Sequence, residues 1–83
     1  MNVKVTVKTP HGTTRYCVLD ADKNVEEQWK IVLAVTPGCG FSVDVRETEI
    51  RLVDYFAGET RATFEILKKE ETDLPVSLSW AEE

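Results

Sequence analysis

The sequence predicts an α+β fold, in which a small, mostly antiparallel sheet of five to six strands carries one helix packed on one face. Three observations lead to this prediction: several short segments alternate apolar and polar residues, one segment has helical periodicity, and turn-forming residues lie between them. The 83 residues are 42% hydrophobic and 30% charged, which is typical of a globular protein. A chain of this length is expected to form a single domain, residues 1–83.

The N-terminal segment predicts a β-hairpin. Val3, Val5 and Val7 alternate with polar residues, as expected for a strand with one buried face. Residues 9–12, Thr-Pro-His-Gly, favour a turn because proline presets φ and glycine accepts a left-handed conformation. Residues 15–19 then form the second strand.

Residues 24–36 predict the helix. Asn24 and Glu27 have the spacing of a capping box. The residues expected on its buried face are Val25, Trp29, Val32, Leu33 and Thr36. The helix is expected to end at Pro37. The alternative is a strand, because residues 31–35 are apolar and rich in β-branched side chains, and the fold would then be all-β.

The segment after Gly40 returns to a period of two. Residues 41–45 alternate, and residues 50–52 continue the apolar series with the opposite parity. A β-bulge or a tight turn is therefore expected between residues 46 and 49. Residues 55–59 predict the next turn, and residues 61–66 predict the strand that follows it.

The C-terminal segment predicts a charged loop followed by an edge strand. Residues 68–73 are mostly charged and form the expected loop. Pro75 indicates that the last strand begins at or after this residue and lies at a sheet edge. Val76, Leu78 and Trp80 supply the alternation of that strand. Two strands, a helix and three or four further strands resemble the order of elements in a β-grasp fold, in topology and not in sequence.

The negative charge is concentrated in the second half of the chain. Residues 41–83 contain eleven Asp and Glu against five Lys and Arg, a net charge of −6. Residues 1–40 contain five basic and four acidic residues, a net charge of +1, which gives the overall −5. Nucleic acids and anionic membranes attract basic surfaces, so neither is expected as a direct partner.

Nothing in the sequence predicts an enzyme, a cofactor site or a metal site. His11 is the one histidine and lies in a predicted turn, so a site with several histidines is excluded. Cys17 and Cys39 have no zinc-site spacing and are expected to be free thiols in a reducing compartment. No signal peptide or apolar span is recognisable, so the expected location is cytoplasmic.

The most specific functional prediction is a small, non-catalytic interaction module that binds a basic protein partner, as an inhibitor or an adaptor. Its carboxylates are expected on outward positions of the strands, beside one exposed aromatic anchor. The predicted partner-binding residues are Asp44, Glu47, Glu49, Asp54, Tyr55, Phe56, Glu59 and Glu65. A structural explanation competes with this one, because neighbouring arginines are placed to form cross-strand ion pairs with the same carboxylates.

Two alternatives from other functional classes remain open. The first is a small thiol-based enzyme or redox protein centred on Cys39, which lies between two glycines. A position after the helix C-terminus argues against it, because the negative end of the helix dipole disfavours a thiolate. The second is a self-associating structural subunit, a homodimer through the C-terminal edge strand at residues 76–80.

Overall fold

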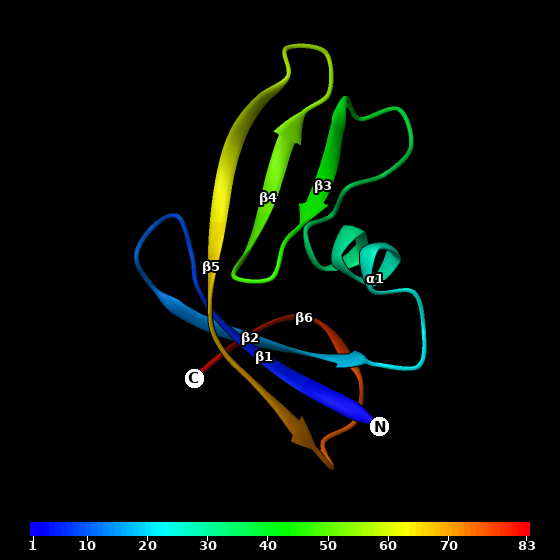
Figure 1. Ribbon diagram of the computed structural model, residues 1–83, viewed down its shortest axis with the longest axis vertical. Helices are drawn as coiled ribbons and strands as arrows, with labels where there is room; N and C mark the ends of the chain where they lie inside the picture. The colour runs from blue at the N-terminus through cyan, green and yellow to red at the C-terminus, as the bar shows by residue number, and fades with distance from the viewer.

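The computed structural model describes all residues from Met1 to Glu83 and contains six strands and one helix. The elements are β1 (Asn2–Lys8), β2 (Thr14–Asp20), α1 (Val25–Val32), β3 (Phe41–Val45), β4 (Glu49–Asp54), β5 (Glu59–Thr72) and β6 (Ser77–Glu82). The strands form one sheet in the order β3-β4-β5-β1-β2-β6, and every pairing is antiparallel (Figure 1). The predicted α+β class is confirmed.

Two of the topologies considered from the sequence do not apply. Residues 25–32 are helical, so the all-β alternative is wrong. The β-grasp-like topology does not describe the sheet either, because β1 pairs antiparallel with both β2 and β5, whereas a β-grasp sheet contains a parallel central pair. The predicted β1–β2 hairpin is confirmed, and a tight turn at residues 46–48, not a bulge, changes the parity between β3 and β4.

Strand β5 is the long central element that joins the two halves of the sheet (Figure 1). Its first half pairs with β4 and its second half pairs with β1. Between them the register shifts, because Val7 faces Ile66 while Thr6 faces Lys68, which leaves Leu67 as the extra residue of a β-bulge. A bulge bends its strand and increases the local twist. The two halves of the sheet therefore lie at an angle to each other, as Figure 1 shows.

The predicted charged loop at residues 68–73 is wrong, because β5 continues to Thr72. Lys68 and Glu70 lie on the outer face of the strand, away from α1, and form an ion pair of 3.1 Å. Charged residues on both faces remove the period-two signal, although the backbone still pairs with β1. A run of charged residues therefore does not by itself indicate a loop, because a strand can continue beyond the edge of the hydrophobic core.

Helix α1 begins as the sequence predicts. The Asn24 side chain accepts a hydrogen bond of 2.9 Å from the backbone N–H of Glu27, which satisfies one of the free donors in the first turn. Trp29 and Val32 are buried, which confirms the centre of the predicted apolar face.

The helix ends four residues before Thr36, so the predicted length of residues 24–36 is too long. Ala34 adopts a left-handed φ of 57° and its N–H binds the carbonyl of Ile31 at 3.1 Å. The N–H of Val35 binds the carbonyl of Lys30 at 2.8 Å. These two bonds form a Schellman motif, which ends the helix before proline is reached.

The hydrophobic core lies between α1 and the concave face of the sheet. It is formed by Val5, Val7, Cys17, Leu19, Trp29, Val32, Val43 and Ile50. Helix α1 contacts β2, β3 and β6, and so reaches both edge strands of the sheet. The ring of Trp80 in β6 stacks on the ring of Phe64 in β5, with the ring centroids 5.4 Å apart, although β1 and β2 lie between those strands in the sheet. The sheet must therefore curve strongly for its two halves to meet around the helix.

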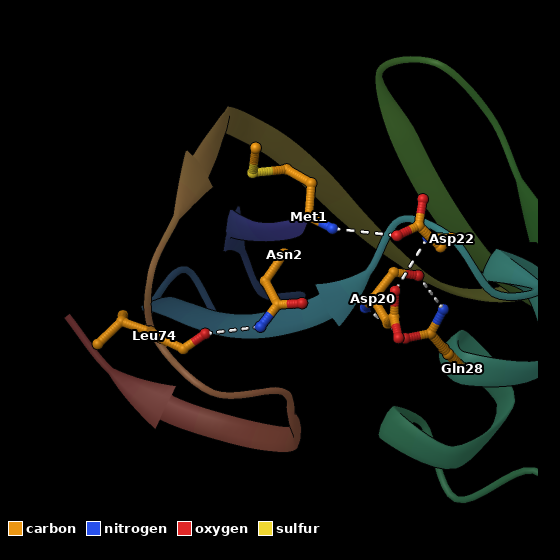
Figure 2. A network of polar contacts seen from close by, with 6 residues as sticks. All are labelled: Met1, Asn2, Asp20, Asp22, Gln28 and Leu74. Atoms are coloured by element: carbon orange, nitrogen blue, oxygen red, sulfur yellow. Dashed lines mark hydrogen bonds and ion pairs between the residues drawn. The ribbon is translucent and has the colours of Figure 1, made fainter.

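Gln28 fastens α1 to the end of β2 (Figure 2). Its side chain is 6% exposed, and its amide oxygen accepts from the Asp20 N–H at 2.7 Å. Its amide nitrogen donates to the Asp20 carbonyl at 2.8 Å and to the Asn24 carbonyl at 3.2 Å. One buried amide thus satisfies both backbone groups of Asp20. Elsewhere in Figure 2, Asn2 donates to the Leu74 carbonyl at 2.8 Å and holds the β5–β6 loop against β1.

The fold contains no helix that could span a membrane. The single helix has eight residues, and it is neither long nor apolar enough to cross a bilayer.

Candidate functional site

The turn between β4 and β5 is held by several internal hydrogen bonds and stands at the top of Figure 1. The carboxylate of Asp54 accepts hydrogen bonds from the backbone N–H groups of Phe56 and Ala57, each at 3.0 Å. The Asp54 carbonyl accepts another from Gly58 at 2.8 Å. Gly58 has a φ of 67°, which glycine adopts without strain. Asp54 therefore fixes the backbone of the turn.

The same turn exposes two adjacent aromatic side chains. Tyr55 is 71% exposed and Phe56 is 87% exposed. Their rings meet edge to face, with centroids 5.6 Å apart. This is a favourable geometry for an aromatic pair, so each ring limits the freedom of the other. Phe41 of β3, which pairs with Asp54, is also 40% exposed.

The loop that leads into β3 supports this turn from the side. Tyr55 donates its backbone N–H to the carbonyl of Gly40 at 2.9 Å. A Cβ atom at Gly40 would lie 3.5 Å from the ring of Phe56, and Gly40 has a φ of 85°. Another residue at position 40 would therefore be strained by the positive φ, although its Cβ would make only an ordinary van der Waals contact with the Phe56 ring. We call Phe41 and residues 54–59 the aromatic tip.

Arg61 balances the two carboxylates at the base of the aromatic tip. Its guanidinium lies 2.9 Å from Asp54 and 3.2 Å from Glu59. The backbone N–H of Ala57 and the Arg61 guanidinium lower the pKa of Asp54 below its ordinary value, because both stabilise the charged carboxylate. The tip therefore presents an apolar surface, and one arginine against two carboxylates leaves a net charge of −1 at its base.

The other predicted carboxylates lie away from the tip. Asp44, Glu49 and Glu65 point from the outer face of the sheet, since the residues that alternate with them enter the core. Glu65 lies directly opposite Glu49 in the register of β4 and β5. Glu47 is in the turn between β3 and β4, at the other end of β4 from the tip.

Arginines neutralise much of this outer surface. Arg46 lies 2.8 Å from Asp44, and Arg51 pairs with Glu49. Glu47 and Glu65 are the two predicted carboxylates without an ion pair. The cross-strand pairing expected from the sequence is present between Arg61 of β5 and Asp54 of β4. Arg46 and Arg51 instead each pair with a carboxylate two residues before it in the chain.

The eight predicted site residues thus fall into three groups. Asp54, Tyr55, Phe56 and Glu59 meet at the aromatic tip; Asp44, Glu49 and Glu65 share the outer face; Glu47 stands apart. Sequence reasoning missed the contribution of Phe41 and Gly40, because Pro37 to Gly40 suggested only a helix stop. The pairing of Phe41 with Asp54 depends on a register that no local pattern reveals.

The two thiols are free and occupy different environments. Cys17 is fully buried in β2, and burial raises the pKa of its thiol to about 12. Cys39 is exposed, and its Sγ donates to the Phe41 carbonyl at 3.9 Å. No group of three or more His, Cys, Asp or Glu side chains is arranged to hold a metal ion.

Comparisons of the chain with protein-family models, with curated proteins and with solved structures find no match.

Proposed function

We propose that the protein is a small, non-catalytic interaction module that binds a basic protein partner through the aromatic tip. The observation that carries this proposal is the pair Tyr55 and Phe56, almost fully exposed on a turn whose backbone is held by Asp54. Single exposed apolar residues are common on protein surfaces. Two adjacent aromatic side chains on a braced turn are typical of a binding hot spot.

The energetics favour the two aromatic side chains as anchors. Complete burial of one large apolar side chain is worth about 1.5–3 kcal/mol. The turn is already fixed by its internal hydrogen bonds, so little conformational entropy remains to be lost on binding. Anchoring by Tyr55 and Phe56 together would supply several kcal/mol, which is enough to dominate a small interface.

The charge distribution favours a basic partner. The chain carries a net charge of −5, and Glu47 and Glu65 form no ion pair, although Lys8 lies opposite Glu65 in the register of β1 and β5. Arginines already offset the carboxylates at Asp44, Glu49, Asp54 and Glu59, so these contribute less than a count of acidic residues suggests. Charge then acts mainly on the association rate and on partner choice, and the aromatic side chains supply most of the affinity.

Such a module acts as an inhibitor or as an adaptor, depending on whether its partner's own site is covered. Free thiols at Cys17 and Cys39 favour a reducing compartment, so we place this activity in the cytoplasm. The same surface gives no support for direct binding of nucleic acid or of a membrane, since basic residues do not gather on it.

The structure also favours a second candidate, self-association through β6. This strand lies at the edge of the sheet and pairs with β2 alone. An unpaired edge is a template for a strand from a second copy. Ser79 is exposed near its middle, and Ser79→Lys introduces a charge that discourages edge pairing. Sedimentation equilibrium should show a dimer that this substitution weakens; a monomer at all concentrations contradicts self-association.

The interaction proposal is tested by capture from the native host's lysate at low salt, with elution by salt. The immobilised proteins are the wild type, the double variant Tyr55→Ser/Phe56→Ser, and a control, Leu67→Ser. Leu67 is a suitable control because it is 50% exposed but lies on the β5 bulge, away from the tip. We expect a basic protein on the wild type and the control that is lost from the double variant.

A further inference from the structure

An apolar cavity opens between α1 and the concave face of the sheet, on the side of the second half of β5. Its volume is about 180 Å³, and nine of its ten lining residues are hydrophobic. Its walls include Val5, Leu19, Trp29, Ile50 and Ile66, which come from five different elements. Val5, Leu19, Trp29 and Ile50 are at most 4% exposed and form the floor of the cavity, while its open side is lined by residues such as Val25 and Val45, which are 38% and 37% exposed.

The tenth lining residue is Lys69, the one charged group on this cavity. Lys69 lies opposite Val5 in the register of β1 and β5, on the face that α1 covers. The Leu67 bulge produces this orientation, because the extra residue reverses which side chains of β5 point toward the helix. Without the bulge, Lys69 would stand on the outer face.

Lys69 is also one of the few cations without an ion-pair partner. Its neighbour Lys68 on the opposite face pairs with Glu70 at 3.1 Å, and every arginine of the chain pairs with a carboxylate. The chain has fifteen acidic and ten basic residues. On such a carboxylate-rich surface, an unpaired ammonium at the mouth of an apolar cavity is uncommon. Its charge is free to pair with an incoming anion.

From this arrangement we infer that the cavity binds a small free carboxylic acid with an apolar tail, such as a short aliphatic acid. The tail lies along Val25, Val45 and Ile66, over the buried floor of the cavity, and the carboxylate meets the Lys69 ammonium at the mouth. An apolar cavity of about 150 Å³ holds a molecule the size of benzene, so this one accepts a chain of about six carbons. Charge complementarity selects a carboxylate over an amine or an alcohol of the same length.

The binding of this ligand does not depend on the aromatic tip. The tip lies at the far end of β4 and β5, and no residue is shared between the two sites. Failure of one proposal therefore leaves the other unaffected.

The test is an NMR titration of the full chain with hexanoate, followed by ¹H–¹⁵N correlation spectra. Acetate carries the negative charge but lacks the tail. 1-Hexanol has the tail but no charge, and hexylamine has the tail with the opposite charge. We expect saturable shifts with hexanoate at about millimolar concentration, centred on Val25, Val45 and Ile66. Acetate and hexylamine should give no saturable shifts at these residues, and 1-hexanol should bind more weakly than hexanoate.

Three variants make the assignment of Lys69 specific. Lys69→Met should weaken hexanoate binding about fivefold and leave 1-hexanol unchanged, since an exposed or partly exposed ion pair is worth up to about that factor. Lys69→Arg should retain the preference for the carboxylate. Lys68→Met, on the outer face, is the matched control and should leave hexanoate binding unchanged.

Several results would overturn the inference. These are an absence of saturable shifts with hexanoate, shifts centred elsewhere on the protein, or equal affinity for hexanoate and 1-hexanol. Equal effects of Lys69→Met and Lys68→Met would also overturn it, because a non-specific charge effect does not distinguish the two faces of β5. All these side chains are exposed at their charged ends, so the variants are expected to fold.

Discussion

At the scale of single residues, Gln28 shows how one side chain joins two elements. Its amide binds both backbone groups of Asp20 while the residue itself is buried. A non-polar side chain at this position would leave the Asp20 N–H without this partner, and the Asp20 carbonyl would keep only its hydrogen bond of 3.2 Å from the Lys23 N–H. The sequence offers no sign of this role, because a glutamine in the middle of a helix is ordinarily exposed.

Gln28→Leu should lower the free energy of unfolding by about 1–3 kcal/mol, which is the cost of leaving such groups unsatisfied. Chemical denaturation measured by circular dichroism provides the test. The control is Glu27→Gln, which changes an exposed neighbour and should alter stability by about 0.5 kcal/mol or less. Equal stability of the two variants would show that the Gln28 hydrogen bonds are not important.

Asp54 is the residue on which the order of the aromatic tip depends. Its pKa is lowered by the N–H of Ala57 and by Arg61, so the folded turn stabilises the charged carboxylate. The contribution to stability is present above the unfolded pKa, and it is lost as the pH falls through the lower folded pKa. The tip should therefore stay ordered at neutral pH and loosen in strong acid.

An NMR titration of the Asp54 carboxyl carbon measures this effect. The midpoint should lie below 3.8, the ordinary value for aspartate, and the amide signals of Phe56 and Ala57 should shift with the same midpoint. The chain unfolded in urea serves as the reference. A folded-state midpoint at or above 3.8 would mean that the hydrogen bonds to Asp54 do not persist in solution.

At the scale of elements, the C-terminus of α1 carries a local strain. Ala34 has a φ of 57°, a conformation that costs a residue with a side chain roughly 1 kcal/mol and that glycine adopts freely. The Schellman bonds from Ala34 and Val35 hold it there. Ending the helix at this point turns the chain back toward β3.

Ala34→Gly should therefore raise the free energy of unfolding by about 0.5–1 kcal/mol. Thermal denaturation would detect this as a higher melting temperature. The matched control is Ala57→Gly, in the exposed turn, where no positive φ is present and no gain is expected. A destabilised Ala34→Gly variant would show that the left-handed conformation is absent in solution.

The elements differ in how far the sequence predicts them. The β1–β2 hairpin and the start of α1 are encoded locally, by alternation, by turn residues and by the Asn24 cap, and sequence reasoning finds them. The bulge at Leu67 and the second half of β5 depend on pairing with β1, which is distant in sequence. For the same reason the sequence predicts Tyr55 and Phe56 as candidates for the site but not their contact with Gly40.

At the scale of the whole molecule, the curvature of the sheet produces both candidate sites. The bend at the β5 bulge leaves the β4–β5 turn projecting from one end (Figure 1). The same bulge turns Lys69 toward the cavity under α1. Net charge, in contrast, proves to be a coarse guide, because arginines pair with four of the six carboxylates singled out from the sequence.

The salt dependence of partner binding follows from this charge pairing. Only Glu47 and Glu65 among the predicted carboxylates are unpaired, so raising the salt from 50 to 300 mM should weaken binding to the partner by about tenfold or less. Removal of both aromatic side chains should weaken it far more. Calorimetry at the two salt concentrations compares these effects on the affinity directly. If the affinity depended on salt but not on the two aromatic side chains, anchoring by the aromatic tip would be contradicted.

Anchoring of a protein partner by Tyr55 and Phe56 can be measured by quantitative capture from the host lysate. The measurement compares, by mass spectrometry, proteins retained by the wild type, by Tyr55→Ser/Phe56→Ser and by Leu67→Ser. We expect a basic protein that is retained by the wild type and by Leu67→Ser and is depleted at least tenfold on the double variant. The same proteins at equal abundance on all three would contradict this anchoring.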